Sequence, residues 1–253
     1  MATPREINRH MKSVGNIGKI TKAMKMVAAA RLRRAQEKAA ASRPYAIKIK
    51  EVLSNVVSDP SVLAGLDAKK HPLLQKREVQ KVGYLVLCSD KGLAGAYSSN
   101  ALKMAVAEIS ECEDEVVVIT CGRKARDFFT RRGFNVIQSH IGFSDRPTYE
   151  NAVDIAQDAI KTFASEGFDK LNIVYTVFKT ALSQIPTSEV ILPVEPPVKE
   201  EGKAQASFMF EPGEDDTLTV LAPKYLETVV YAALVQSAAS ELGSRMTAMS
   251  SAT

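Results

Sequence analysis

The first part of the chain carries an apolar stripe at helical spacing. Apolar residues recur three and four positions apart through the first 57 residues, which is the period of one helix face. Pro4 stands where a first-turn proline is tolerated, and Thr3 is the candidate N-cap. The pattern predicts one helix over residues 4–57, with Pro44 as a candidate break or kink. Such a helix is roughly 80 Å long, so it must bury its stripe against a partner helix.

The middle of the chain alternates between two patterns. The predicted strands are Val82–Cys88, Glu115–Cys121, Phe134–Gln138, Leu171–Phe178 and Glu189–Val194, and the predicted helices are Ser99–Ile109, Arg123–Arg132 and Tyr149–Glu166. Strands that alternate with helices are typical of an α/β domain with a parallel sheet. The stretch Glu195–Asp216, rich in Pro, Glu and Gly, is interpreted as a surface loop that holds one short strand, Ala206–Phe210.

The last segment, Pro223–Thr253, has a second helical stripe and a predicted length of about 45 Å. Two long terminal helices around one body are natural mates for an antiparallel coiled coil. The predicted fold class is therefore α/β, with a long antiparallel coiled coil of the N- and C-terminal helices and a Rossmann-like α/β central domain. The predicted division is a coiled-coil helix over 1–58, a linker over 59–80, the α/β domain over 81–216 and a coiled-coil helix over 217–253.

The charge is distributed unevenly along the chain. Residues 1–50 contain thirteen basic and two acidic residues, a net charge of +11, whereas the remaining 203 residues contain 20 basic and 27 acidic residues, a net charge of −7. Three interpretations of this basic helix stay open: a solvated face, a nucleic-acid-binding arm, or a helix buried in an acidic protein collar. A solvated face usually carries acidic partners four residues away. A nucleic-acid arm fits the charge, but Tyr45 is its single aromatic residue.

Residues with catalytic or metal-binding chemistry are scattered. The cysteines are Cys88, Cys112 and Cys121, and the histidines are His10, His71 and His140. None has ligand spacing, and Cys88 and Cys121 stand in apolar runs where a free cysteine is usually a small core residue. No GxSxG motif and no acid–base pair stand out. The sequence predicts no catalytic residue, no cofactor and no metal site.

The turn Ser89–Gly95 follows a predicted strand and precedes a helix. A glycine-containing turn of this kind can bind phosphate through backbone N–H groups. It lacks the GxGxxG and GxxxxGK[ST] patterns, which favours a tight turn that presents Asp90 and Lys91 at the surface. No run approaches the roughly 20 apolar residues of a membrane span, and no apolar signal core opens the chain. We therefore expect neither export nor direct membrane insertion.

Several segments together resemble the F-type ATP synthase gamma subunit of bacteria. They are Lys19–Ala30 (KITKAMKMVAAA), Ser42–Tyr45 (SRPY), Lys70–Leu73 (KHPL), Val82–Gly95 (VGYLVLCSDKGLAG) and Ala239–Met249 (ASELGSRMTAM). Lys91 stands where the family usually has arginine, Ala94 where it has cysteine, and Gly243-Ser244 where Ala-Ala is common. The family's C-terminal helix continues for many turns beyond Thr253, so we expect a truncated end that leaves the first turns of the N-terminal helix without a partner.

The resemblance implies the central rotor shaft of an F-type ATP synthase. Such a shaft couples proton- or sodium-driven rotation of the c-ring to ATP synthesis or hydrolysis in the alpha–beta catalytic ring, and is no enzyme itself. The implied partners are three alpha and three beta subunits, the epsilon subunit and the membrane c-ring, with no nucleic acid. The implied location is peripheral, on the cytoplasmic face of the bacterial membrane. The alternative function is a nucleic-acid-binding protein that uses the basic helix.

The resemblance also suggests which residues make coupling contacts. They are Ser13, Lys19, Met24, Lys91, Gly92, Leu93, Glu241 and Arg245. Glu241 and Arg245 are four residues apart, so we expect them to form an ion pair on one helix face.

Overall fold

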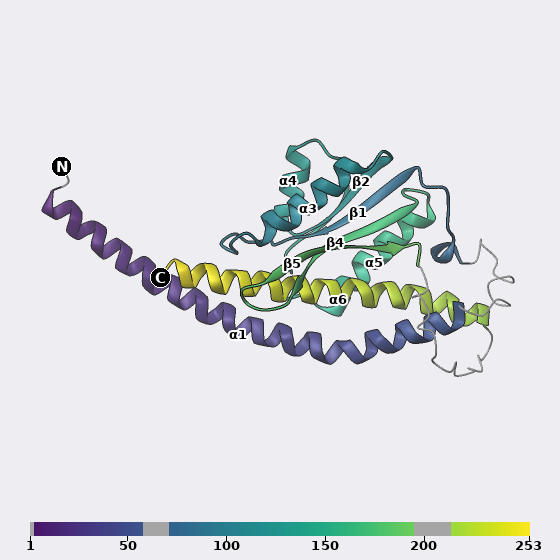
Figure 1. Cartoon of the computed structure of the whole chain (residues 1–253), viewed down its shortest axis with the longest axis horizontal. Helices are drawn as coiled ribbons and strands as arrows, with labels where there is room; N and C mark the ends of the chain where they lie inside the picture. The colour runs from purple at the N-terminus through teal and green to yellow at the C-terminus, as the bar shows by residue number, and fades with distance from the viewer. Residues whose placement is uncertain (1–2, 58–70, 195–213) are drawn as a thin grey trace.

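Two long helices lie side by side beneath an α/β body (Figure 1). The computed structural model describes residues 3–57, 71–194 and 214–253. The helices are α1 (Pro4–Val57) and α6 (Glu214–Ser251). They run antiparallel: the hydroxyls of Thr21 and Thr253 are 2.6 Å apart at one end of the pair, and Leu53 and Leu218 are buried in one core cluster at the other. The antiparallel pair expected from the apolar stripes is confirmed.

Small residues allow α1 and α6 to approach closely. Leu32 and Ala35 of α1 pack against Ala239 and Leu242 of α6. The helix α1 is continuous through Pro44, so of the two candidate effects of this proline, a break and a kink, the break does not occur. A proline removes only one backbone hydrogen bond, and the apolar face of α1 continues to pack on α6 on both sides of it. The helix instead curves gently along its length, as Figure 1 shows.

The body is built on one five-stranded sheet. Its strands are β1 (Lys81–Leu87), β2 (Glu115–Cys121), β3 (Val136–His140), β4 (Lys170–Phe178) and β5 (Gln184–Leu192). The spatial order is β3-β2-β1-β4-β5, and the first four strands are parallel. This is the Rossmann-like arrangement expected from the alternating pattern. The edge strand β5 is antiparallel to β4, because the few residues between them can form a hairpin but not a crossover.

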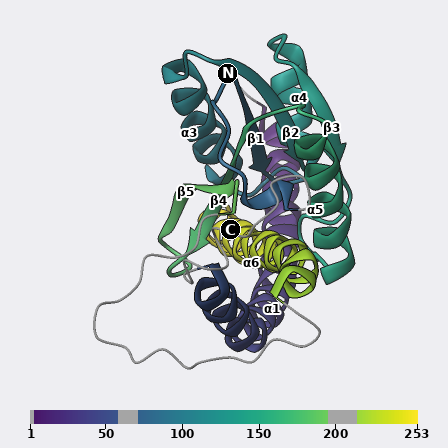
Figure 2. The ribbon, with the colours of Figure 1, turned by 90° about the vertical axis from the view of Figure 1, so that its right-hand side faces the viewer.

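Helices cover both faces of the sheet (Figure 2). Helices α3 (Tyr97–Glu111) and α4 (Arg123–Arg131) pack on one face, while α5 (Tyr149–Ala164) and α6 pack on the other. A short 3₁₀ helix, η1 (Pro72–Leu74), precedes β1. Cys88 and Cys121 are buried in these cores, as expected, and burial raises the pKa of both thiols. The helix α6 therefore belongs to both the helix pair and the core of the body.

Several element boundaries differ from those predicted. The helix α6 begins at Glu214 rather than at Pro223, because the apolar face continues back to the fully buried Leu218. The strand β3 begins at Val136 rather than at Phe134, whose ring packs edge-to-face on Phe129. The strand β5 begins at Gln184, five residues before the predicted start. The short strand predicted over 206–210 lies outside the described residues.

The helix α6 is long and apolar enough to cross a membrane by length and composition alone. Its segment Thr217–Ser251 contains a window with a mean hydropathy of 1.4, which contradicts the expectation that no run would qualify. Half of that window is buried inside the fold, and elsewhere the same helix buries the ionisable Glu241 and Arg245. Core helices of globular proteins meet the same criterion, so the finding describes a central packing helix.

Candidate functional site

The C-terminal half of α6 fills the crevice at the end of β4. Pairing between β1 and β4 stops at Val174, and beyond it α6 side chains bond to the backbone of β4. The hydroxyl of Ser237 accepts from the Thr176 amide at 3.3 Å, and that of Ser240 donates to the Thr176 carbonyl at 2.9 Å. In open α/β sheets this crevice is the usual place for a small ligand. Here it holds the protein's own helix.

The loop after β1 rests on the same helix. The Ser244 hydroxyl donates to the Ala94 carbonyl at 2.7 Å, and Arg245 donates to the Gly92 carbonyl at 3.3 Å. Gly95 has a φ of +53°, and a Cβ there would lie 2.9 Å from the Ser244 hydroxyl. Only glycine accepts both this backbone conformation and this approach. The turn Ser89–Gly95 is thus held against α6, and we name it the docking loop.

Gly243 allows an equally close approach on the other side of α6. A Cβ at this position would lie 2.9 Å from the Phe178 ring. The neighbouring Thr247 hydroxyl donates to the Ala181 carbonyl, in the turn between β4 and β5, at 3.0 Å. A mid-helix glycine costs about 1 kcal/mol relative to alanine, and the contact with the hairpin explains why one stands here.

Glu241 and Arg245 form a buried ion pair beside the docking loop. A guanidinium nitrogen of Arg245 lies 2.8 Å from Oε1 of Glu241, but the geometry is not that of a hydrogen bond. The Glu241 side chain is 0% exposed and the Arg245 side chain 9%. Burial raises the pKa of Glu241, although the nearby Arg245 charge opposes that shift. The expected i,i+4 pair is therefore present, but inside the protein. A buried carboxylate depends on its partner far more than an exposed one does.

Asp145 joins α1 to the body. Its carboxylate pairs with Arg31 of α1 and, at 3.2 Å, with Lys91 of the docking loop. Burial alone would raise the pKa of Asp145, but the hydrogen bond from Lys91 and the charges of Lys91, Arg31 and Arg245 together lower it. Asp145 is thus ionised at neutral pH and is shared by two basic side chains, Arg31 of α1 and Lys91 of the loop after β1.

Asp90 holds the backbone that presents Asp145. Its carboxylate accepts from the amides of Gly142 and Ser144, at 2.9 and 3.0 Å, and from the Arg123 amide at 3.1 Å. The Asp90 amide in turn donates to the Ser144 hydroxyl at 2.9 Å. Asp90 was expected to be presented at the surface like Lys91. It instead ties the docking loop to the 142–145 loop and to the start of α4.

An apolar hollow of about 500 Å³ lies where these segments meet. Five of the expected coupling residues line it, namely Met24, Lys91, Gly92, Leu93 and Arg245. Glu241 pairs with Arg245 directly behind it. Leu93 is 64% exposed, so the hollow opens to the outside of the junction between the helix pair and the body. We name this region, with Arg31, Asp90 and Asp145, the junction.

Ser13 and Lys19 lie away from the junction. Both are exposed on the part of α1 that precedes its contact with Thr253, where no other element of the described residues packs on α1 (Figure 1). The apolar stripe of that segment is also exposed, from Ile7 at 51% to Met11 at 66%. The sequence prediction missed Arg31 and Asp145, which are 114 residues apart. The available signal was weak: Asp145 is a polar residue in the loop after a parallel strand.

The described residues define a class of protein. A long antiparallel helix pair, in which α1 carries an exposed basic and apolar segment, is attached to an α/β body through the junction. This is a helical stalk on an α/β body, with α6 packed in the crevice beside β4.

Comparisons with known proteins identify the family. The family model described as ATP synthase matches residues 3–253. The chain is 45% identical to the ATP synthase gamma chain of Brevibacillus brevis, over 98% of this chain and 85% of the relative, and 42% identical to that of Desulfitobacterium hafniense, over 100% and 87%. The chain belongs to the ATP synthase gamma chain family, as its signatures indicated.

Solved structures agree on the fold. The central stalk and c-ring structure of the Tetrahymena thermophila mitochondrial ATP synthase contains a chain that superposes with a TM-score of 0.70 at 23% identity, covering 92% of this chain and 99% of that one. The family assignment confirms the role expected from the sequence, that of a rotor shaft in an ATP synthase.

Proposed function

We propose that this chain transmits torque without catalysing any reaction itself. The helix pair turns inside a ring of three alpha and three beta subunits, and the body rests, with epsilon, on the membrane c-ring. The complex then lies on the cytoplasmic face of a bacterial membrane, with this chain as a peripheral component. The filled crevice beside β4 supports the non-catalytic role, and the described residues contain no cluster that could hold a metal ion.

The junction is the observation that carries this proposal. Torque applied to the body must reach both helices, and each has its own connection. The helix α6 is anchored by the Glu241–Arg245 pair and by its bonds to the docking loop. The helix α1 is anchored by Arg31 on Asp145, which also holds Lys91. Because Asp145 is only 11% exposed, water screens these contacts less than it screens surface pairs.

The first turns of α1 face the catalytic ring in this proposal. Ser13 and Lys19 are exposed there, on a segment that is rich in basic residues. A basic shaft inside an acidic collar is attracted at long range, without the deep interlocking that would stop rotation. Met24, with its flexible thioether, and Leu93 lie where this segment meets the body. Each state of the ring must prefer one orientation of the shaft for coupling to occur.

Reconstitution with cognate alpha and beta subunits tests the assembly. We expect an isolated complex with one copy of this chain per ring and with ATP hydrolysis above that of the ring alone. The double charge reversal K19E/K22E should weaken assembly at low salt, whereas K161E on α5 should not. A ring that forms and hydrolyses ATP at full rate while excluding this chain would refute the proposal.

A further inference from the structure

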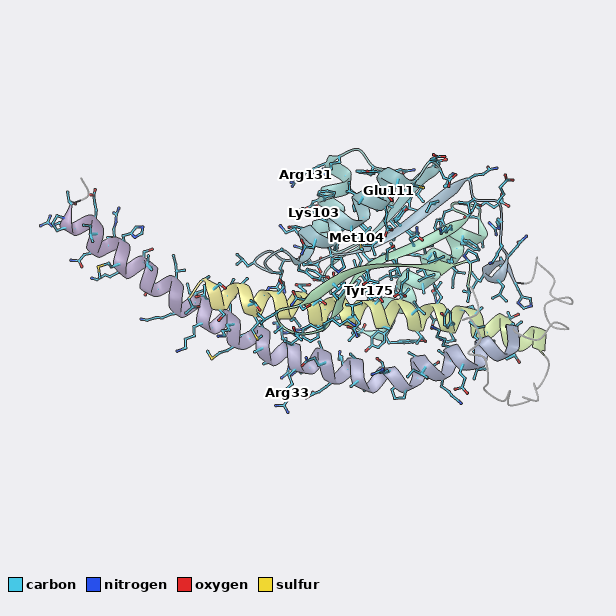
Figure 3. The ribbon with its side chains drawn as sticks, viewed as in Figure 1. Arg33, Lys103, Met104, Glu111, Arg131 and Tyr175 are labelled. Carbon is cyan, nitrogen blue, oxygen red and sulfur yellow. The ribbon has the colours of Figure 1, made fainter. Side chains whose placement is uncertain are left out.

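A basic pocket lies where the docking loop meets α3 and α4. It has a volume of about 430 Å³ and opens between the docking loop, the first turns of α3 and the outer side of α4. Lys124, Phe128 and Arg131 line it from α4. These residues are spaced by four and three positions, so they share one helix face. Figure 3 shows Arg131 at the outer end of α4, far from α1.

The positive charge around this pocket is poorly compensated. Residues 123–132 contain five basic residues and one acid. That acid, Asp127, accepts two hydrogen bonds from Arg126, at 2.8 and 3.0 Å. Within the described ranges, no carboxylate lies within 4 Å of Lys124, Arg131 or Arg132. Like charges that face one hollow repel one another, and an anion bound between them relieves that repulsion.

The geometry favours an anion larger than a single phosphate. Lys124 and Arg131 are seven residues apart, which is about 10 Å along the helix axis. The guanidinium of Arg132 lies 4.0 Å above the centre of the Phe128 ring, which fixes its position at the same end of α4 as Arg131. Arginine forks suit phosphate oxygens, and lysine supplies a point charge at the far end. The ligand must carry negative charge at two separated points.

The walls of the pocket add apolar contacts and backbone space. Leu93 and Leu102 line it together with Phe128. Gly92 has open space where a side chain would stand, so a ligand can approach the docking loop closely. Asp127 is the carboxylate that lines the pocket, and it already accepts hydrogen bonds from Arg126, so it is not placed to act as a general base. These features suit the binding of an anion rather than acid–base catalysis.

We propose that this pocket binds a small molecule with a diphosphate group, held by Lys124, Arg131 and Arg132. The shared chemistry is the diphosphate, whether it comes as inorganic pyrophosphate or as part of a nucleoside diphosphate. Lys91 lines both this pocket and the junction hollow. A bound anion competes with Asp145 for Lys91 and thereby weakens one link between α1 and the body. Binding therefore regulates the stiffness of the junction.

Calorimetric titration of the full 253-residue chain with pyrophosphate tests this proposal. We expect saturable binding that weakens at least tenfold in K124Q/R131Q. The matched control K103Q/K161Q removes two charges from exposed sites on α3 and α5 and should change the affinity less than twofold. Circular dichroism verifies that both double variants are folded. A parallel titration with ADP distinguishes the two sources of the diphosphate group. If ADP binds more tightly than pyrophosphate, the pocket also recognises the nucleoside. If the two bind equally, the diphosphate accounts for the affinity.

Three results would overturn the proposal. They are no binding of pyrophosphate to the unaltered chain, an equal loss of affinity in the control variant, and binding of hexaglutamate without binding of pyrophosphate. The last result would assign the pocket to an acidic protein segment. The titration uses the chain alone, so its failure leaves the proposed shaft function standing.

Discussion

Removal of Arg245 should expose how much the buried ion pair contributes to the fold. In R245M the apolar side chain fills a similar volume, while Glu241 stays fully buried without its partner. Loss of one partner of a buried pair typically costs about 3–5 kcal/mol of unfolding free energy. For a chain of this size, each kcal/mol lowers Tm by about 2–4 °C. We therefore expect R245M to lower Tm by roughly 6–20 °C at pH 7.5.

The effect should depend on pH in a definite direction. The folded-state pKa of Glu241 is raised by burial, so this group favours the folded state most below its ordinary pKa of about 4.5, and that contribution is lost as pH rises through the raised value. Without Arg245 the pKa rises further, and protonation removes the uncompensated charge. The difference in unfolding free energy between R245M and the unaltered chain should therefore shrink from pH 7.5 to pH 5.5.

Urea unfolding followed by circular dichroism measures these differences. The double variant E241Q/R245M removes both charges and should regain at least half of the loss. The control R33M breaks the exposed i,i+4 pair between Arg33 and Glu37 and should change the unfolding free energy by less than about 1 kcal/mol. An R245M variant within 1 kcal/mol of the unaltered chain at pH 7.5, or one no worse than R33M, would refute the reasoning.

Three further changes probe the junction. D145N should leave assembly intact but lower the coupling of rotation to hydrolysis, because Arg31 and Lys91 lose their shared anion; unchanged coupling would remove Asp145 from the torque path. G95A should cost about 1–3 kcal/mol in urea unfolding, because its φ is +53° and the new Cβ meets α6, and a loss below 0.5 kcal/mol would contradict this. The swap E241R/R245E should restore part of the ATP-driven rotation lost in either single change, and two silent single changes would make the pair irrelevant to coupling.

The two long helices could be predicted because the spacing of their apolar residues is a local property of the sequence. The stripes of α1 and α6 repeat every three to four residues over many turns, and a helix of that length has no way to bury its stripe alone. The alternation of strands and helices likewise indicated the parallel sheet. Boundaries were less predictable: Pro223 marks a plausible helix start, yet the buried Leu218 extends the helix backwards.

The junction could be predicted only in part. Glu241 and Arg245 are four residues apart on one helix, so their pairing is a local matter. Their burial is not, because it depends on the docking loop reaching across from β1. The contact of Asp145 with Arg31 joins residues that are 114 positions apart, and no period in the sequence relates them. Lys91 was expected to make coupling contacts and Arg31 was one of thirteen basic residues in the first 50, but the sequence related neither of them to Asp145.

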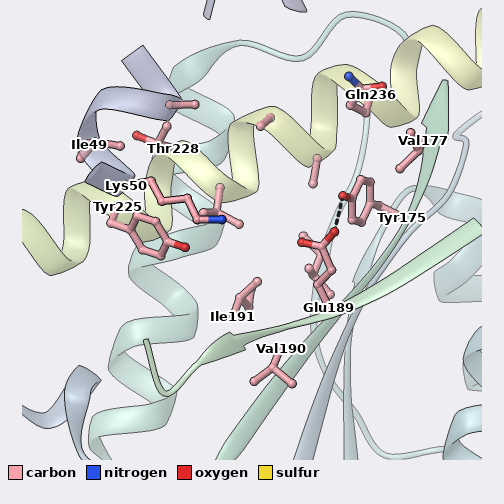
Figure 4. A pocket seen from close by; sticks show the side chains of 15 residues that line it. Ile49, Lys50, Tyr175, Val177, Glu189, Val190, Ile191, Tyr225, Thr228 and Gln236 are labelled. Carbon is pink, nitrogen blue, oxygen red and sulfur yellow. Dashed lines mark hydrogen bonds between the residues drawn. The ribbon is translucent and has the colours of Figure 1, made fainter. Parts of the chain in front are cut away.

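A pocket of about 370 Å³ between the helix pair and the edge of the sheet shows the same limit. It is lined by α1, α6, β4 and β5, and the Tyr175 hydroxyl donates to Glu189 within it at 2.8 Å (Figure 4). Burial and this hydrogen bond raise the pKa of Tyr175. The pocket forms only where four elements come together, so it cannot be predicted from any single segment of the sequence.

Rotation of single molecules tests the central claim most directly. A bead is attached to the body through K103C, with Cys112 replaced by serine, in a complex whose alpha–beta ring is fixed to a surface. The account predicts unidirectional rotation of the bead during ATP hydrolysis, with slipping or lower torque in D145N/R245M. A bead that stays still while the ring hydrolyses ATP at the normal rate, with this chain in place, would contradict the claim that the junction drives the body and the helices as one shaft.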